Sequence, residues 1–282
     1  MEPLRDRVLA FLRHRNIRLN TDLGQHFLVE EEPLEMILGA AQINPEDHVV
    51  EIGPGIGILT SELLMHAGAV TAIELDDRMI PLMKDFLLAR SERVRSGGPP
   101  KDKRHAKKFT VIHGNALSTP LPKTPYKIVA NIPYHITSPL IRHAYLESNT
   151  APTTMTLLIQ SEVAEKICDE EHAGILTIMV RLFGIPEMIC IVRPEAFVPP
   201  PKVDSAVLHI VSHSQPITDR ETIDRILKLL KLAFGGKRKM LRNTLGKLEN
   251  GMERLKKAGI DPARRPETLN VEEWMKLVKS QN

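Results

Sequence analysis

The residues best suited to chemistry begin at a glycine-rich turn, Gly53-Pro54-Gly55-Ile56-Gly57, which follows the strand-like run Val49 to Ile52. Glycine permits positive φ angles and a close approach of the backbone to a ligand, and the helix predicted from Ile58 onward presents free N–H groups. A second predicted strand, Val70 to Ile73, ends at Glu74, whose carboxylate can accept two hydroxyl hydrogen bonds at once. This pattern predicts a cradle for a nucleoside-type ligand.

The glycines alone leave alternatives open. A dinucleotide fingerprint would place its third glycine at position 58, where the chain has Ile58. The pattern therefore disfavours a nicotinamide-dependent oxidoreductase. A tight strand-to-helix turn that binds no ligand is the second alternative.

Two more strand ends are expected in the same crevice. The run Phe109 to Ile112 leads to Gly114-Asn115-Ala116, and the apolar run Ile128 to Ala130 leads to Asn131-Ile132-Pro133-Tyr134. Carboxyl ends of parallel strands meet at one edge of a doubly wound sheet, where ligands bind. The sequence therefore predicts one pocket that combines a ligand cradle with an amide and an aromatic ring.

The elements that must position these residues alternate between strand and helix. Apolar spacing predicts helices over residues 31–41, 77–88, 138–146, 162–167 and 174–183, and further strands over 154–159, 188–192 and 206–211. Alternation of this kind predicts an α/β fold, and the last two strands would form an antiparallel hairpin at its end.

Strand signals stop near residue 214, so we expect two domains, residues 1–214 and residues 215–282. In the second, a helix is expected to begin at Thr218, another to follow Lys237-Arg238-Lys239, and a last one to be capped by Asn270. The second domain is therefore predicted to be small and all-helical.

The composition favours a cytoplasmic protein. The 282 residues carry a net charge of +3, and two cysteines are too few for a disulfide framework. No apolar run is long enough to span a membrane, and we recognise no signal-peptide core. Cys168 and His172 have the spacing of a metal pair but lack further ligands. We therefore expect neither a membrane contact nor a bound metal.

Two basic segments are candidates for contact with nucleic acid. Residues 1–20 read as an amphipathic basic helix followed by an arm, and residues 91–108 carry seven basic side chains around Gly97-Gly98-Pro99-Pro100. The second segment is expected to be a mobile loop because its composition cannot pack. A merely solvated surface is the alternative for both.

Five sequence features carry a resemblance to a known family. The stretch Glu51 to Gly57, the strand-end Glu74 and the run Asn131 to Tyr134 resemble the motifs of S-adenosylmethionine-dependent adenine-N6 methyltransferases. With Leu23 to Leu28 and Phe197 to Val207 added, nearly the whole chain resembles the small-subunit ribosomal RNA adenine dimethyltransferases of the KsgA type. The resemblance implies a Rossmann-like methyltransferase domain with a small all-helical C-terminal domain.

The resemblance also implies S-adenosylmethionine as cofactor and assigns roles at matching positions. The implied cofactor contacts are His26, Leu28, Gly53, Gly55, Glu74, Asn115 and Asn131. The implied catalytic residues are Asn131, Ile132, Pro133, Tyr134 and Phe197. The alternative for His26 is that it is a polar loop residue with its hydrogen bonds made within the protein and no contact with the cofactor.

The implied chemistry has to activate a poor nucleophile, because the adenine amine shares its lone pair with the ring. Hydrogen bonds from the amine to Asn131 Oδ1 and to the Ile132 carbonyl would favour a pyramidal nitrogen and absorb developing positive charge. Tyr134 and Phe197 would stack on the two faces of an unpaired or flipped base. Core packing is the alternative for both aromatic residues.

Asn115 departs from the family, in which an aspartate is common at this position. An amide oxygen can accept the same hydrogen bond from the cofactor's adenine, but without a charge. We therefore expect somewhat weaker cofactor binding than an aspartate would give.

The implied partner is small-subunit, 16S-type ribosomal RNA in a pre-assembled subunit, methylated near its 3′ end during ribosome biogenesis by a monomeric enzyme. One alternative is methylation of large-subunit RNA, which the helical tail and the 197–207 loop disfavour. Another is a ribosome-assembly or RNA-binding factor that has lost the chemistry, against which the intact Asn131, Pro133 and Tyr134 argue.

Overall fold

A computed structural model describes residues 2–17, 19, 24–96, 109–236 and 239–280, and for residues 90–96 it describes only the backbone. These residues form two compact units. The first contains residues up to 164 and residues 187–211, and the second contains residues 165–186 and those from 212 onward. Within the described ranges, no helix has both the length and the apolar character needed to cross a membrane.

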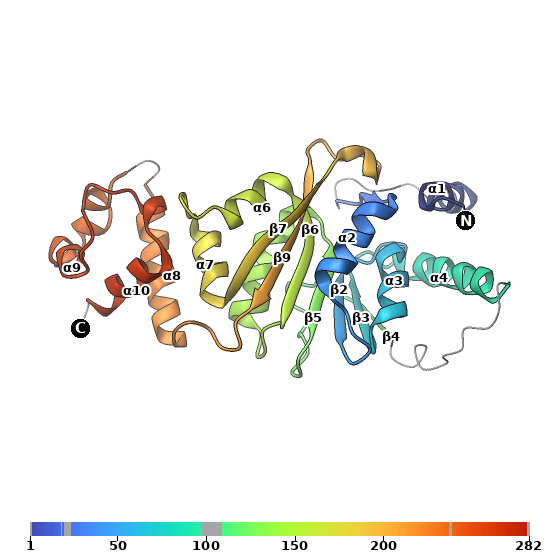
Figure 1. Cartoon of the computed structure of the whole chain (residues 1–282), viewed down its shortest axis with the longest axis horizontal. Coiled ribbons are helices and arrows are strands. Elements are labelled where there is room, and N and C mark those ends of the chain that lie inside the picture. Colours follow the sequence, from blue (N-terminus) through green and yellow to red (C-terminus); the bar gives the residue numbers. More distant parts are fainter. Residues whose placement is uncertain (1, 18, 20–23, 97–108, 237–238, 281–282) are drawn as a thin grey trace. The chain divides into compact units, whose positions relative to one another are not determined.

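The described part of the chain contains a seven-stranded sheet in the order β4-β3-β2-β5-β6-β9-β7 (Figure 1). Its strands are β2 (His48–Ile52), β3 (Ala69–Glu74), β4 (Phe109–His113), β5 (Lys127–Asn131), β6 (Thr154–Gln160), β7 (Gly184–Val192) and β9 (Ser205–Ser212). The strands from β4 to β6 pair in parallel, and β9 pairs antiparallel with β6. The chain runs outward from β2 to β3 and β4 and then returns to β5. A ligand site is expected where the order reverses, at the carboxyl ends of β2 and β5.

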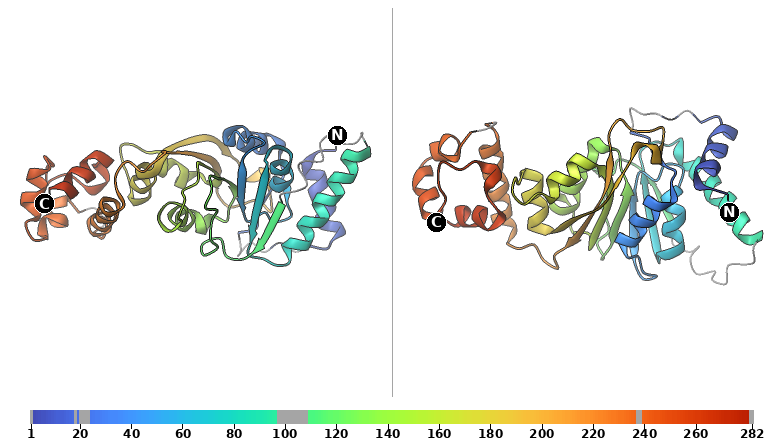
Figure 2. Two further views of the ribbon diagram at one scale, coloured as in Figure 1. Left: turned by 90° about the horizontal axis from the view of Figure 1, so that it is seen from below. Right: turned by 45° about the horizontal axis from the view of Figure 1, so that its top comes forward.

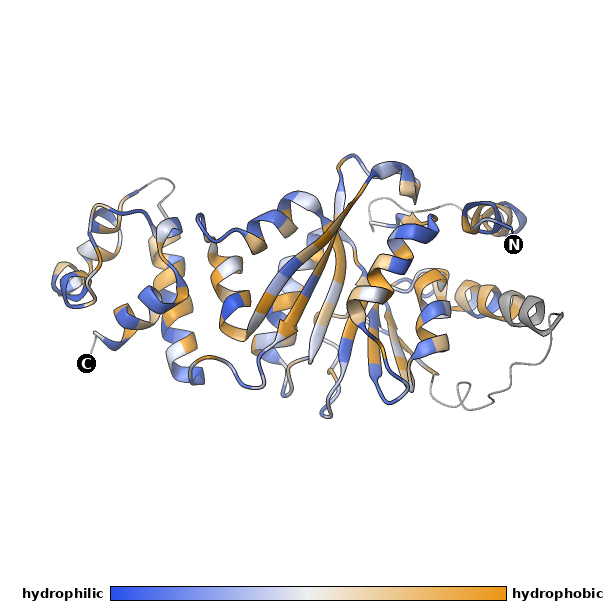
Figure 3. Cartoon of the chain, in the orientation of Figure 1, coloured by the Kyte–Doolittle hydropathy of each residue, from blue (hydrophilic) through white to orange (hydrophobic). Residues whose placement is uncertain are grey.

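Apolar residues cover both faces of the central strands. β2 buries Val49, Val50 and Ile52, and β5 buries the run Ile128 to Ala130. Strands that are covered on both faces have this composition. Figure 3 shows the hydrophobic residues along these strands.

The helices of the first unit lie on both faces of the sheet. They are α1 (Leu4–His14), α2 (Glu31–Ala41), α3 (Ile58–His66), α4 (Met79–Ser96) and α5 (Thr137–Arg142), which continues as the π-helical η4 (His143–Glu147). Figure 2 shows α2 and α3 on one face and α5 on the other. α1 packs into the same core through Leu4, Val8 and Leu12.

A separate two-stranded sheet joins segments that are far apart in the sequence. β1 (Phe27–Leu28) pairs antiparallel with β8 (Phe197–Val198), so that Leu28 lies opposite Phe197. The short helical turn η5 (Pro194–Ala196) precedes β8, and the Ala196 carbonyl accepts a hydrogen bond from the Val29 N–H at 2.8 Å. The segment before α2 is thereby fixed to the loop between β7 and β9.

The second unit is helical. Its main elements are α7 (Ile175–Phe183), α8 (Arg220–Phe234), α9 (Gly251–Lys257) and α10 (Val271–Lys279), while α6 (Ser161–Cys168) spans the division between the units. α8 contacts both α7 and α10. The Asn270 side chain accepts a hydrogen bond from the Glu273 N–H at 2.9 Å, and Glu273 bonds back to the Asn270 N–H at 3.0 Å. This capping box confirms the predicted start of the last helix.

Residues 165–186 belong to the second unit, whereas the sequence led us to expect them in the first domain, residues 1–214. α7 contacts α8 and α10, and Ala173 N–H donates to the Glu267 carbonyl at 2.8 Å. A sequence pattern shows which residues of a helix are apolar, but it does not show which other helices they contact.

Two local expectations were wrong. The segment predicted as a loop from Ser91 is helical up to Ser96, because glycine and proline begin only at Gly97; residues 97–108 lie outside the described ranges. The helix expected after residue 239 is instead a pair of short turns, η6 (Leu241–Asn243) and η7 (Leu245–Lys247), followed by α9. A Cβ atom at Gly251 would lie 2.1 Å from the Leu245 carbonyl oxygen, so the chain folds back on itself where the predicted helix would have continued.

Candidate active site

The glycine-rich turn between β2 and α3 adopts backbone angles that favour glycine. Gly53, Gly55 and Gly57 have φ angles of +65°, +57° and +90°. A Cβ atom at Gly55 would lie 2.6 Å from the Phe27 ring, and one at Gly57 would lie 2.8 Å from Met83 Cγ. The turn therefore requires glycine for its conformation and for its packing. Gly53 and Gly55 also line a cavity.

Glu74 ends β3 and binds the turn from the neighbouring strand. Its Oε2 accepts a hydrogen bond from the Gly55 N–H at 3.0 Å, and its Oε1 accepts one from the Asp76 N–H at 2.9 Å. Burial raises the pKa of this carboxyl, although the two backbone hydrogen bonds act in the opposite direction. Each oxygen retains a second acceptor site, so the predicted bonds to ligand hydroxyls are compatible with this arrangement.

A second acid, Glu51 on β2, belongs to the same cavity wall. Its side chain is 1% exposed, and burial raises its pKa to about 8, while hydrogen bonds from Thr60 lower the pKa and the nearby Glu74 raises it further. In the described part of the chain, Glu51 Oε2 has no hydrogen-bond partner. A ligand that carries positive charge would offset the cost of ionising these two buried acids.

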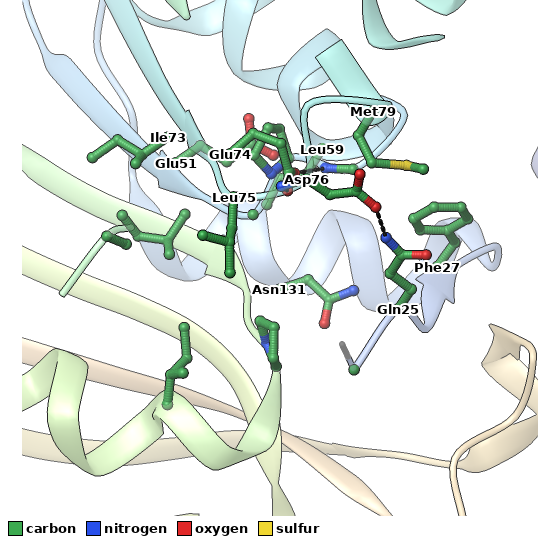
Figure 4. A pocket seen from close by; sticks show the side chains of 18 of the residues that line it. Gln25, Phe27, Glu51, Leu59, Ile73, Glu74, Leu75, Asp76, Met79 and Asn131 are labelled. Atoms are coloured by element: carbon green, nitrogen blue, oxygen red, sulfur yellow. Dashed lines mark hydrogen bonds between the residues drawn. The ribbon is translucent and has the colours of Figure 1, made fainter. Parts of the chain in front are cut away.

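Asn131, the last residue of β5, lines the cavity with its side-chain amide held in place (Figure 4). Its Nδ2 donates to the His26 carbonyl at 3.0 Å. Because a carbonyl oxygen can only accept, this contact defines the nitrogen end and leaves Oδ1 to receive other hydrogen bonds. Pro133 packs against Gly24, where a Cβ atom would lie 2.7 Å from Pro133 Cβ.

Residues 24–28 form a further wall of the cavity. Gln25 Nε2 donates to Asp76 Oδ2 at 2.9 Å, which Figure 4 shows as a dashed line. His26 Nδ1 lies 2.7 Å from the Pro199 carbonyl, so this nitrogen carries the proton. The segment thus connects the Asn131 region with the end of β3.

The cavity brings together most of the residues predicted from the sequence. Its lining includes His26, Leu28, Gly53, Gly55, Glu74, Asn115, Asn131 and Pro133. Asn115 Oδ1 accepts a hydrogen bond from the Leu117 N–H at 2.9 Å and so holds its own loop. The four strand ends expected to meet do meet at one edge of the sheet.

The remaining predicted residues, Ile132, Tyr134 and Phe197, are not among those that line the cavity. The Ile132 side chain is 2% exposed, and the role expected of this residue uses its carbonyl. Tyr134 is partly exposed, and its ring lies parallel to the His26 ring, with centroids 6.3 Å apart and planes 9° apart. Phe197 is 1% exposed and belongs to the apolar core, so stacking on a base would require it to leave that core.

Several residues that line the cavity were given no role from the sequence. Gln25 and Glu51 lie within recognised motifs, and Leu75, Asp76, Met79, His135 and Ile136 lie outside them. Leu75 could have been recognised from the sequence, because an apolar side chain between two acids at a strand end is unusual. In the structure it is 59% exposed. Asp76 has its pKa lowered by hydrogen bonds from Arg78 and Gln25. The 3₁₀ turn η3 (Tyr134–Ile136) directs His135 and Ile136, and the sequence pattern gave no sign of it.

A largely parallel sheet with a glycine turn after β2, an acid ending β3 and a cavity at the β2 and β5 strand ends is the arrangement of Rossmann-like methyltransferases. Comparison with known proteins gives the family. A family model described as ribosomal RNA adenine dimethylase matches residues 16–282. The ribosomal RNA small subunit methyltransferase A of Dehalococcoides mccartyi is 40% identical over 278 residues, covering 93% of this chain and 88% of that protein.

Two solved structures are similar over most of their length. A dimethyladenosine transferase from Plasmodium falciparum has 28% identity and a TM-score of 0.72, covering 89% of this chain and 96% of that one. The 23S rRNA methyltransferase ErmE has 27% identity and a TM-score of 0.67, covering 90% of this chain and 98% of that one. The chain belongs to the ribosomal RNA adenine dimethylase family.

Proposed function

We propose that this protein transfers methyl groups from S-adenosylmethionine to the N6 amines of adenines near the 3′ end of small-subunit ribosomal RNA, two for each base. The observation that carries the proposal is the meeting of the glycine turn, Glu74 and Asn131 around one cavity. The choice of small-subunit RNA as the substrate rests on the 40% identity to a small-subunit methyltransferase. The proposed substrate is an assembled small subunit, on which the protein acts as a monomer in the cytoplasm.

The residues of the cavity fit S-adenosylmethionine. When bound, this cofactor supplies a methyl group on a positively charged sulfur, and it also carries an ammonium group. Glu51 and Glu74 provide negative charge when ionised, and burial makes that charge costly without a cationic partner. Gly53 and Gly55 allow a ligand to approach the backbone, and Glu74 offers acceptors to ribose hydroxyls.

Asn131 is positioned to act on the adenine amine. Its Oδ1 is the free end of an amide whose nitrogen is bound to the His26 carbonyl, so the acceptor does not need to reorient when the amine arrives. The Ile132 carbonyl follows directly in the chain. Pro133 restricts the backbone angles of Ile132 and so the direction of this carbonyl. Tyr134 then presents a ring on which an extruded base can stack.

The proposal is tested by incubating the protein and labelled S-adenosylmethionine with small ribosomal subunits that lack these methyl groups. Digestion and mass spectrometry should find dimethylated adenine in the RNA fragment nearest the 3′ end. Large subunits from the same cells serve as the matched control. If neither particle is methylated, the proposed enzymatic activity is refuted. If only the large subunit is methylated, the assignment of the small subunit as substrate is refuted.

Large-subunit RNA is the second candidate substrate because the ErmE structure is similar at a TM-score of 0.67. The 40% identity to a small-subunit methyltransferase favours the first candidate. A factor without chemistry is disfavoured, since Asn131 keeps an acceptor, unpaired among the described residues, that the proposed reaction would use.

Asn115 gives a prediction for cofactor binding. We expect Asn115→Asp to bind S-adenosylmethionine about three- to tenfold more tightly, since a charge-assisted hydrogen bond is roughly twice as strong as a neutral one. Aspartate can keep the bond to the Leu117 N–H with one oxygen and offer the other to the cavity. Titration calorimetry measures the difference, with the exposed Asn149→Asp as a control for added charge. Equal or weaker binding by Asn115→Asp would contradict the expectation.

A further inference from the structure

Tyr134 is held at the far end of its ring by a residue from a distant part of the chain. Its hydroxyl lies 2.7 Å from Ser205 Oγ, and either oxygen can be the donor. Ser205 is the first residue of β9 and is fully buried. It therefore offers Tyr134 a partner whose position is set by the sheet.

The backbone around both residues is fixed. Ser205 lies opposite Gln160 at the end of β6, in the antiparallel pair of β6 and β9. On the other side, the Tyr134 carbonyl accepts a hydrogen bond from Thr137 Oγ1 at 3.0 Å. The contact between the Tyr134 and Ser205 hydroxyls therefore bridges two elements, η3 after β5 and the start of β9, across the end of the strand between them.

A tyrosine ring that is anchored only at its Cα can rotate about two side-chain bonds. The hydrogen bond at its hydroxyl removes most of this freedom, and the ring is held parallel to that of His26. Burial raises the pKa of the Tyr134 phenol, which keeps it protonated and able to donate near neutral pH. The face of the ring is thus oriented before any base arrives.

We propose that Ser205 is a positioning residue for methyl transfer, which orients the Tyr134 ring for stacking on the extruded adenine through the hydrogen bond between their hydroxyls. The proposal rests on the function proposed above. It assigns a role to the Phe197 to Val207 loop that does not depend on exposure of Phe197. It also predicts that Ser205 acts on the chemical step and not on cofactor binding.

The kinetic test is a double-mutant cycle of Ser205→Ala and Tyr134→Phe, with transfer to unmethylated small subunits as the readout. Each variant should lower kcat about five- to tenfold, the range for loss of one hydrogen bond. The KM for the subunit and the Kd for S-adenosylmethionine should each change less than about twofold, because phosphate contacts dominate RNA affinity. The double variant should be no slower than either single one.

The same variants allow a test that does not depend on activity. The chain has three tyrosines, so ring-labelled tyrosine gives a simple NMR spectrum in which Tyr134 can be assigned from Tyr134→Phe. In the free protein, Ser205→Ala should change the Tyr134 ring signals and speed its ring flips, while Tyr126 and Tyr145 remain unchanged. Ser212→Ala at the other end of β9 is the matched control and should leave all three unchanged.

The outcomes of these tests distinguish failure of the positioning role of Ser205 from failure of the proposed methyltransferase function. If the native protein methylates subunits and Ser205→Ala is as fast, or if the two single effects multiply in the double variant, the positioning role is overturned. An unchanged Tyr134 ring in Ser205→Ala overturns it as well. If the native protein transfers no methyl group at all, the proposed function fails, and the NMR result alone decides whether Ser205 orders the ring.

Discussion

Replacing Asn131 by alanine should lower the rate of methyl transfer about 10²- to 10³-fold, the range found when one preorganised hydrogen-bonding group is removed from a transition state. The structure gives the reason, since Asn131 Nδ2 binds the His26 carbonyl and Oδ1 has no hydrogen-bond partner among the residues that the structure describes. Single-turnover transfer to unmethylated small subunits measures the chemical step directly. Binding of the subunit itself should persist, which separates an enzyme from a factor that only binds.

Two controls sharpen this experiment. Asn149→Ala changes an exposed asparagine outside the cavity and should transfer methyl groups at the native rate. Asn131→Asp keeps an acceptor oxygen but loses the donor to His26, so it should fall between the native protein and Asn131→Ala. A native rate in Asn131→Ala would show that the amide does not take part in the reaction.

Replacing Glu51 by glutamine should stabilise the ligand-free protein at high pH. The folded pKa of Glu51 is raised to about 8 from 4.5, so the folded protein binds this proton more tightly than the unfolded chain does. The free energy of unfolding therefore falls as the pH rises from 4.5 towards 8. At about 1.4 kcal/mol per pH unit, the loss across this interval is on the order of several kcal/mol, and a glutamine avoids it because it does not ionise.

Urea unfolding between about pH 5 and about pH 9 tests this expectation. The native protein and Glu51→Gln should be similar at the acid end and should diverge as the pH rises. Glu35→Gln, an exposed change on α2, should follow the native curve throughout. Curves for Glu51→Gln and the native protein that run parallel across the range would show that Glu51 is not buried as an acid.

The sequence predicted the central part of this fold because its signals were local and consistent. The helix over residues 31–41 and the strands that end at Ile52, Glu74 and Asn131 were found where they were expected. Each combines apolar periodicity with a clear stop, such as Gly53 after β2. Because strands of a doubly wound sheet end at one edge, the position of the cavity could also be predicted.

What the sequence did not predict depends on contacts between distant residues. Phe197 has the residue type of a stacking group. Its burial follows from the pairing of β8 with β1, which places Phe197 opposite Leu28, a residue far earlier in the chain. Ser205 lies within a sequence motif, but it is the fold that brings its hydroxyl beside that of Tyr134. Glu51 belongs to the motif at the end of the first predicted strand, but its raised pKa results from burial, which the sequence does not show.

The close packing of Gly24 on Pro133 and of Gly55 on Phe27 limits how this site can be redesigned. A larger residue at either glycine would displace its aromatic or cyclic neighbour, and the positive φ angles of Gly24 and Gly55 would strain it even if the neighbour were made smaller. Efforts to admit bulkier synthetic donors should therefore keep both glycines and vary positions 27 and 133.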